Sequence, residues 1–135
     1  MADYEKFLPD VTPLHEPFWA AVKGHRIELQ RCDACGAFRF IPSELCQCGS
    51  ATSTWTPIAG TGEVYTYTVV HRAPTPAYQA DAPYVIAHVT VDEGPRMISN
   101  LIGCDPGDVH IGMRVQLVYE DVTPDLTLYK FTPAG

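Results

Sequence analysis

The chain has 135 residues, of which 46% are hydrophobic and 19% charged, as in a compact folded unit and unlike a disordered segment. Its formal net charge of -7 argues against binding to nucleic-acid phosphates or anionic lipid, because such binding depends on displacing counterions with lysine and arginine. The sequence has no run of about 18 apolar residues to span a membrane, and no basic segment precedes an apolar one at the N-terminus, so we expect a cytoplasmic protein without membrane contact.

The first predicted element is a short helix over residues 16–24, which follows an extended arm. Pro17 suits the first turn of a helix and Gly24 its C-terminal cap, while Phe18 and Val22 share one face. Two helical turns are not stable alone in water. We therefore expect this helix to pack either on the rest of the chain or on a partner.

Strands are predicted for most of the remaining chain. Residues 26–31 alternate, with Ile27 and Leu29 on one face and polar residues, Gln30 among them, on the other. This strand leads directly into a cysteine-rich stretch, after which a second strand is predicted at residues 54–58.

Beyond residue 59, turn signals separate five further β segments. Glycine, proline and aspartate mark the turns, and a proline-rich stretch at residues 73–83 predicts a loop. The segments cover residues 63–70, 84–91, 96–102, 113–120 and 126–131. Five strands of this size fit a closed barrel of the oligonucleotide/oligosaccharide-binding type (OB-fold), since closure removes exposed sheet edges; a small sandwich is the alternative.

These elements predict a mainly β protein in three parts. The parts are an N-terminal arm and helix (residues 1–25), a ribbon around the cysteines (26–58) and a five-stranded OB-fold barrel (59–135). The sequence shows neither an internal repeat nor a low-complexity tract.

The cysteine pattern gives the strongest indication of chemistry. Zinc binds four thiolates tetrahedrally, and a ribbon supplies them from two tight turns. A glycine, Gly36 or Gly49, follows each cysteine pair and adopts without steric cost the left-handed backbone that such a turn often needs. Four thiolates leave no open position for water or substrate, so the predicted zinc is structural. The predicted ligands are Cys32, Cys35, Cys46 and Cys48.

The second cysteine pair is unusually close. One residue, Gln47, separates Cys46 from Cys48, whereas two residues separate the first pair, as in a standard knuckle. The shorter spacing limits the positions that the two sulfur atoms can take around one ion. A pair of turns without metal, or a disulfide, is therefore an alternative to bound zinc. The fifth cysteine, Cys104, lies apart beside a turn and is expected to be a buried structural thiol.

Ligand candidates outside the cysteines are weaker. His71 and Arg72 end the longest predicted strand beside the proline-rich loop that holds Tyr78. A cation near aromatic rings on a barrel loop could contact a nucleotide or the phosphates of coenzyme A; the alternative is an exposed loop pair with no ligand. Tyr65 and Tyr67 share a strand face on which bases could stack, but the sequence predicts no basic groove to accompany them.

The sequence indicates no self-sufficient catalytic centre. No glycine-rich phosphate loop joins a strand to a helix, and no serine lies in a nucleophile elbow. His88 falls inside a predicted strand, where a satisfied sheet residue is a simpler interpretation than a general base.

Several stretches, taken in order, resemble the DUF35 family. They are Glu16-Pro17-Phe18-Trp19, Leu29-Gln30-Arg31-Cys32-Asp33-Ala34-Cys35-Gly36, Gly60-Thr61-Gly62, Val64-Tyr65-Thr66-Tyr67-Thr68-Val69-Val70-His71-Arg72, Pro83-Tyr84-Val85-Ile86-Ala87 and Gly103-Cys104-Asp105. The resemblance covers nearly the whole chain and rests on the order and spacing of individually modest motifs. It implies a rubredoxin-like zinc ribbon joined to an acyl-CoA-associated OB-fold.

The same resemblance implies a non-catalytic accessory or scaffold subunit. DUF35 proteins act beside thiolase-fold enzymes (thiolases, acyltransferases or retro-aldolases) that handle acyl-CoA thioesters, including those of steroid side-chain degradation. In such a hetero-oligomer the nucleophilic cysteine and the histidines belong to the partner, and acyl-CoA binds at or near the interface. Phe18 and Trp19 are the predicted contact residues, because aromatic anchors dominate interface energetics; the alternative is packing on the chain's own barrel.

Two other functions compete with this one. A single-stranded nucleic-acid-binding OB-fold module is the main alternative, and the negative charge argues against it. An independent thioesterase or hydrolase would need a nucleophile and a base that the sequence does not indicate.

Overall fold

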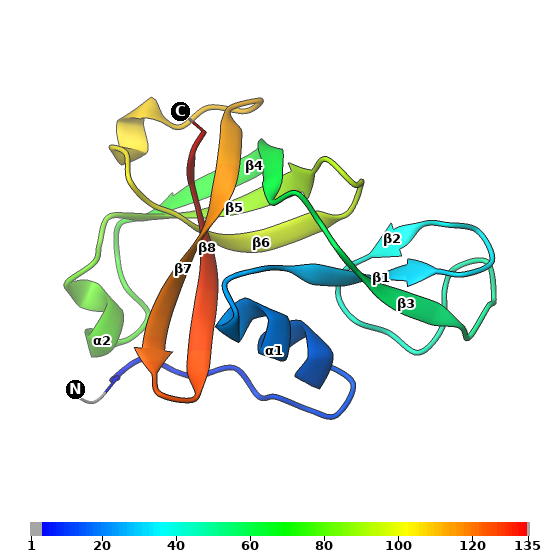
Figure 1. Ribbon diagram of the computed structural model, residues 1–135. Helices are drawn as coiled ribbons and strands as arrows, with labels where there is room; N and C mark the ends of the chain where they lie inside the picture. Colours follow the sequence, from blue (N-terminus) through cyan, green and yellow to red (C-terminus); the bar gives the residue numbers. More distant parts are fainter. Residues whose placement is uncertain (1–3, 135) are drawn as a thin grey trace.

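The computed structural model describes residues 4–134, which form a mainly β protein (Figure 1). Two short helices are α1 (Glu16–Lys23) and α2 (Pro76–Gln79), and a 3-10 turn, η1, covers Pro106–Asp108. The strands are β1 (Glu28–Cys32), β2 (Phe38–Arg39), β3 (Ser53–Pro57), β4 (Thr61–Val70), β5 (Tyr84–Val91), β6 (Arg96–Leu101), β7 (Arg114–Thr123) and β8 (Leu126–Pro133). Within residues 4–134, no helix has the length and apolar character needed to cross a lipid bilayer.

The strands build two separate sheets. A three-stranded antiparallel sheet in the order β2-β1-β3 forms the ribbon, and a closed barrel follows in the order β4-β5-β6-β8-β7. The long strand β4 closes the barrel, because it pairs with β5 along most of its length and with β7 through residues 61–63. The predicted five-stranded OB-fold barrel is thereby confirmed.

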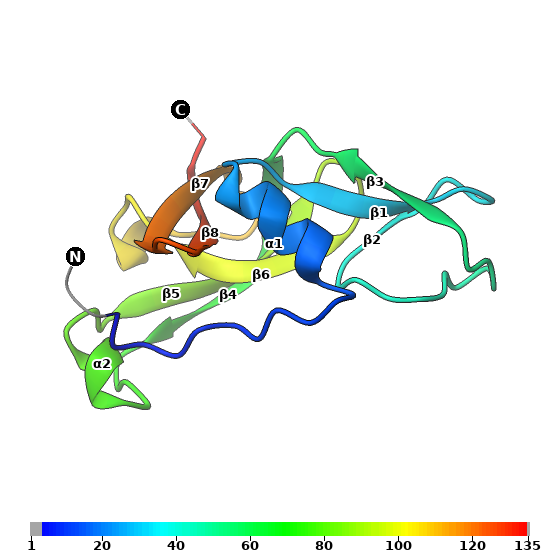
Figure 2. The ribbon, with the colours of Figure 1, turned by 60° about the horizontal axis from the view of Figure 1, so that its bottom comes forward.

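One hydrophobic core joins the barrel to the helix and the ribbon. Alternate residues of the barrel strands point inward, as the period-2 pattern predicts. The cluster continues into α1 through Phe18 and Val22, and into β1 and the residue before it through Leu29 and Ile27. Figure 2 shows α1 lying against the barrel next to β1. The barrel-strand residues of this cluster are Val64, Val85, Ala87, Val89, Val91, Met97, Leu101, Val115 and Phe131.

Strand ends differ from the sequence prediction by one to three residues, and three differences concern the barrel and its loops. The predicted bend at residues 60–62 is confined to Gly60, whose φ is +85°, since β4 begins at the next residue. The β7–β8 hairpin is longer than predicted, with β7 ending only at Thr123. The loop at residues 73–83 contains α2, whose four residues are too few for a periodic pattern to indicate a helix.

One residue of β1 departs from the predicted polar face. Gln30 is only 5% exposed. Its side-chain oxygen accepts hydrogen bonds from Arg39 Nε at 3.1 Å and from the backbone N–H of Ser43 at 2.8 Å. These bonds tie β1 to β2 and to the segment that follows β2, and they compensate the burial of the polar group.

Candidate metal centre

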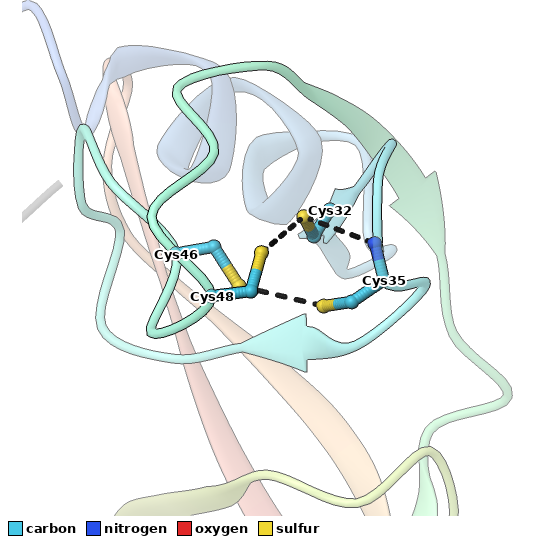
Figure 3. Close-up of side chains that lie close together, drawn as sticks. All are labelled: Cys32, Cys35, Cys46 and Cys48. Atoms are coloured by element: carbon cyan, nitrogen blue, oxygen red, sulfur yellow. Dashed lines mark hydrogen bonds between the residues drawn. The ribbon is translucent and has the colours of Figure 1, made fainter.

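Four cysteine side chains meet in the ribbon (Figure 3). Cys32 ends β1 and Cys35 follows in the turn toward β2, whereas Cys46 and Cys48 lie in the stretch that precedes β3. Their four sulfur atoms all lie within 4.8 Å of one another. The structure thus brings the predicted ligands together from two segments of the chain.

The distances between sulfur atoms fit a tetrahedral metal site. Cys32 Sγ lies 3.6 Å from Cys48 Sγ, and Cys35 Sγ lies 3.6 Å from Cys46 Sγ. A tetrahedron of four sulfurs with Zn–S bonds of about 2.3 Å has edges of about 3.8 Å. A disulfide would require a separation of about 2.05 Å. The geometry therefore fits a bound metal ion and does not fit a disulfide.

The close spacing of the second pair does not prevent this convergence. In the first turn the backbone N–H of Gly36 donates to the Cys32 carbonyl oxygen at 2.9 Å, and Gly36 has a φ of +76°. In the second turn, which is one residue shorter, the N–H of Gly49 donates to the Cys46 carbonyl oxygen at 2.8 Å, with a φ of +93°. A left-handed glycine closes each turn, so the shorter turn also presents its sulfurs to the common centre.

Hydrogen bonds make the thiols of the cluster unlike one another. The backbone N–H of Cys35 donates to Cys32 Sγ at 3.5 Å and is the main cause that lowers the pKa of Cys32 to about 6. A backbone hydrogen bond from Ser50 lowers the pKa of Cys48, but the neighbouring sulfurs outweigh it and raise that pKa to about 11. Thiolates this close repel each other, and a divalent cation removes the conflict because it binds the thiolate form.

The three predicted ligand contacts of the barrel lie on the bend after β4 and on α2. His71 and Arg72 are exposed at the bend after β4. Tyr78 lies in α2, where its ring packs near Tyr84 with centroids 5.7 Å apart. It lines a cavity of about 470 Å³ whose described lining residues include neither His71 nor Arg72. Of the three, Tyr78 alone lines this cavity.

The N-terminal arm contributes to this cavity, which sequence reasoning missed. Lys6 Nζ forms an ion pair with Asp81 at 2.6 Å and lies 5.3 Å from the centroid of the Tyr78 ring. Lys130 on β8 also lines the cavity and pairs with Glu120 at 2.7 Å. No sequence pattern marks contacts between segments so far apart in the chain. Each ammonium group has a carboxylate partner, so the cavity is not strongly cationic.

Phe18 and Trp19 have different environments. Phe18 is 2% exposed, and its ring lies 5.1 Å from Trp19 and 5.7 Å from both Phe40 and Tyr129, measured between centroids. Phe18 therefore packs within the chain and is not an exposed partner contact. This is the alternative that the sequence left open, and it arises because α1 turns the Phe18 side chain toward β8 and the ribbon. Trp19 is half-buried and lines a shallow surface groove beside the N-terminal arm.

The remaining candidates lie outside these sites. Tyr65 and Tyr67 are exposed on β4, and the Arg96 guanidinium carbon lies 3.7 Å from the centroid of the Tyr65 ring. His88 is exposed on β5. Cys104 is partly buried, and that burial raises the pKa of its thiol, which keeps it protonated at neutral pH.

Comparison with known protein families agrees with this architecture. Residues 19–53 match the model described as "ChsH2, rubredoxin-like zinc ribbon domain", and residues 55–120 match "ChsH2, C-terminal OB-fold domain". The protein is thus a zinc ribbon joined to an OB-fold, and its four ribbon cysteines are positioned to bind a metal ion.

One relative covers most of the chain and shows the family. The sequence is 40% identical over 111 residues to a DUF35 domain-containing scaffold protein of Methanocaldococcus jannaschii, an alignment that covers 76% of this chain and 78% of the relative. The chain belongs to the DUF35 family.

Two other relatives are considerably longer proteins. The chain is 44% identical over 119 residues to a probable enoyl-CoA hydratase alpha subunit of Thermomonospora curvata. It is 39% identical over 117 residues to a 3-oxo-4,17-pregnadiene-20-carboxyl-CoA hydratase alpha subunit of Mycobacterium tuberculosis. These alignments cover 87% and 86% of this chain but 37% and 36% of the relatives. The chain therefore spans little more than a third of the length of these two proteins.

Solved structures share the complete fold. A chain of the structure described as "Ltp2-ChsH2(DUF35) aldolase" superposes with a TM-score of 0.85 at 40% identity, covering 95% of this chain and 100% of that chain. A DUF35-family protein of unknown function from Sulfolobus solfataricus superposes with a TM-score of 0.65 over 90% of this chain and 86% of that chain. Its identity of 16% supports the fold alone.

Proposed function

We propose that this chain is a non-catalytic scaffold subunit of a thiolase-fold enzyme that acts on acyl-CoA thioesters. The observation that carries the proposal is the likeness, over 95% of the chain, to a chain of a structure named as an Ltp2-ChsH2(DUF35) aldolase. Relatives named as a scaffold protein and as alpha subunits of hydratases support a role inside a larger assembly. The catalytic residues then belong to the partner.

The histidine contacts of this chain are consistent with a scaffold whose partner holds the catalytic residues. His25 Nε2 lies 3.0 Å from Asp121 Oδ1, where it ties the end of α1 to β7. His15 pairs with the hydroxyl of Thr12 beside the start of α1. The His25 contact fastens two segments of the chain. The His15–Thr12 pair is exposed to solvent, and among the described residues no third side chain hydrogen-bonds to the His15 ring to orient it as a base.

The proposal includes a structural zinc ion held by the four ribbon cysteines. The convergence of the sulfurs on one centre supports it, and four thiolates leave no position for a reacting water. Zinc there would fasten the turn after β1 to the stretch before β3. Direct metal analysis of the purified protein should find one zinc per chain, and a content far below one would contradict this part of the proposal.

The proposal also places acyl-CoA near the interface with the partner. Tyr78, which lines the cavity beside α2, and the exposed His71 and Arg72 are the candidate contacts. A ring face and a guanidinium are suited to the adenine and the phosphates of coenzyme A. Because Tyr78 lines the cavity and His71 and Arg72 do not, a single substitution of each residue tests its contact separately.

Co-purification tests the scaffold role. The tagged chain, expressed in its source cell, should recover a thiolase-fold protein in a fixed ratio, which mass spectrometry identifies. Recovery of the chain alone, or turnover of an acyl-CoA thioester by the isolated chain, would contradict the proposal. Micromolar binding of a single-stranded oligonucleotide at low salt would instead favour the nucleic-acid-binding alternative.

Trp19 is the proposed aromatic contact with the partner. Trp19→Ala should weaken co-purification while the circular dichroism spectrum and the zinc content stay unchanged, because the side chain is half-buried on the surface of α1. Ile111→Ala, at a residue that is 68% exposed on the barrel, provides the matched control. Equal recovery of the partner by both variants would remove Trp19 from the interface.

A further inference from the structure

The outer edge of β4 is unpaired over its second half. β4 pairs with β5 from Gly62 to Val70, but it pairs with β7 only through residues 61–63. The bulge between Val64 and Thr66 marks the point where β4 and β7 separate, because a bulge bends the strand that carries it. Figure 1 shows β7 running away from β4 beyond this point, while β4 continues along β5. Within residues 4–134, residues 65–70 therefore have a neighbouring strand on one side only.

The backbone groups on this edge have no other partner among the described residues. Val64 is the last residue of β4 that bonds across the gap, with its N–H to Met113 at 3.0 Å and its carbonyl oxygen to Gly112 at 2.8 Å. From residue 65 to residue 70, the β4–β5 ladder supplies the only main-chain hydrogen bonds found within residues 4–134. Alternate residues of a strand direct their N–H and C=O groups to opposite edges, so half of these groups point away from β5. Another extended polypeptide satisfies donors and acceptors at this spacing.

The side chains of this segment do not protect its edge. Residues 65–68 are all exposed, so both faces of the strand are open there. Residues 65–70 are all β-branched or aromatic and include neither a charge nor a proline, the two residue types that most often keep edge strands from pairing. The outer strands of the ribbon differ, because β2 has only two residues and β3 ends at Pro57. β4 is therefore the better template for a further strand.

Opposite charges lie at the two ends of this segment. Glu63 precedes it and Arg72 follows it, and both side chains are exposed. Within residues 4–134 neither forms a salt bridge. In an antiparallel pair of two such strands, the acidic end of each strand lies beside the basic end of the other. The segment is therefore complementary to itself, as a contact about a two-fold axis requires.

We infer that two copies of this chain pair antiparallel through the free edge of β4, about a two-fold axis that passes near Tyr67 and Thr68. Main-chain hydrogen bonds join the two barrels, and the end charges fix the direction of pairing. The contact is short and each chain has a formal net charge of -7, so we expect a dissociation constant of roughly 10–100 µM at about 0.15 M salt. The inference is independent of the proposed function, because it concerns this chain alone.

Analytical ultracentrifugation of the purified chain tests the pairing. The mass should rise from 14.9 kDa toward twice that value as the concentration increases. Thr68→Lys should weaken association by roughly tenfold or more, because a lysine near the two-fold axis faces its own copy. Gln116→Lys adds the same charge at an exposed position of β7 and should leave the affinity within about twofold. A chain that stays monomeric up to about 1 mM, or a dimer equally tight in both variants, would overturn the inference.

Exchange of the two end charges tests the antiparallel arrangement. Glu63→Arg and Arg72→Glu should each weaken the dimer by roughly fivefold, because each sets like charges beside one another. The double variant should recover the affinity of the unsubstituted chain. Circular dichroism checks that all three variants are folded. Single variants that dimerise normally, or a double variant that stays weak, would contradict the arrangement.

Hydrogen exchange locates the contact. At concentrations that favour the dimer, amides on the free edge of residues 65–70 should gain protection, and Thr68→Lys should remove this gain. A dimer that protects a different segment would overturn the inference. So would protection of residues 65–70 that arises only when the purified thiolase-fold partner is added, because the edge would then accept a strand of another protein.

Discussion

The ribbon and the barrel are ordered by different means. The barrel strands contribute a continuous set of buried side chains, from Val64 to Phe131. In residues 33–59, by contrast, Pro42 is the one buried residue. A segment that buries so little apolar surface needs another source of order, and the four converging sulfurs provide a place for one. The chain thus combines a region held by its core with a region whose four cysteines are positioned to bind a metal ion.

Removing the metal should have the largest effect on stability, and it should unfold only the ribbon. For Cys46→Ser we expect loss of the zinc and of hydrogen-exchange protection in residues 33–59, while the barrel strands stay protected. Structural zinc contributes about 10 kcal/mol or more to folding in small zinc domains. Cys104→Ser changes a thiol outside the cluster and should keep both the zinc and the protection. Simultaneous loss of protection in the barrel would mean that the two regions are not separable.

Opening a cavity in the barrel should give the next largest effect. Phe131 is fully buried, and Phe131→Ala should lower the free energy of unfolding by about 3–5 kcal/mol, measured by urea denaturation. Because α1 and β1 share this core, we expect the ribbon to lose stability as well. Ile111→Ala, at an exposed residue, should change the free energy by less than about 0.5 kcal/mol. A Phe131 variant as stable as this control would contradict the account of the core.

A smaller effect should follow from removing the buried amide of the ribbon. Gln30→Ala leaves Arg39 Nε and the Ser43 N–H without their acceptor, at a cost of about 1–3 kcal/mol. Hydrogen exchange should place the loss in the ribbon and not in the barrel. Gln116→Ala, on an exposed position of β7, is the control. Equal exchange in the two variants would show that the Gln30 contacts do not stabilise the ribbon.

The smallest effect is a pH dependence of the barrel. Two hydrogen bonds from Arg114 at 3.0 Å, with a further one from Thr61, lower the pKa of Asp92 below its ordinary value. The unfolded chain therefore takes up this proton first as the pH falls. The stabilisation is complete above the ordinary carboxyl pKa of about 4 and is lost as the pH drops through the lowered folded value.

Asp92→Asn should make the free energy of unfolding fall less steeply as the pH is lowered into the acid range. Asp125→Asn, at an exposed acid in the β7–β8 turn, serves as its control. Acid limbs of identical slope in the two variants would mean that the Asp92–Arg114 pair adds nothing to the barrel, as many exposed ion pairs do not.

The barrel strands and the cysteine set could be predicted from the sequence because both depend on local patterns. The alternation of Tyr84–Val91 gives that strand its bounds, and a glycine after each cysteine pair marks each turn. Because Cys46 and Cys48 are so closely spaced, the sequence could not decide whether the four sulfur atoms meet at one centre. The structure answers that question, because a left-handed Gly49 closes the shorter turn.

Contacts between distant segments could not be predicted in this way. The face of α1 that holds Phe18 is visibly apolar, but the sequence does not say whether the chain or a partner covers it. The burial of Gln30 depends on Arg39, and the contact of Lys6 with Tyr78 joins the arm to α2. Each of these depends on how the ribbon, the helix and the barrel pack together, which periodicity along the chain does not encode.

The central claim is that this chain supports a partner's chemistry and has none of its own. Reconstitution tests it most directly: the purified thiolase-fold partner is assayed on its acyl-CoA thioester with and without this chain, and the chain is assayed alone. We predict turnover by the pair, little or none by the partner alone, and none by the chain alone. Turnover by the isolated chain, or a partner that is equally active without it, would contradict the claim.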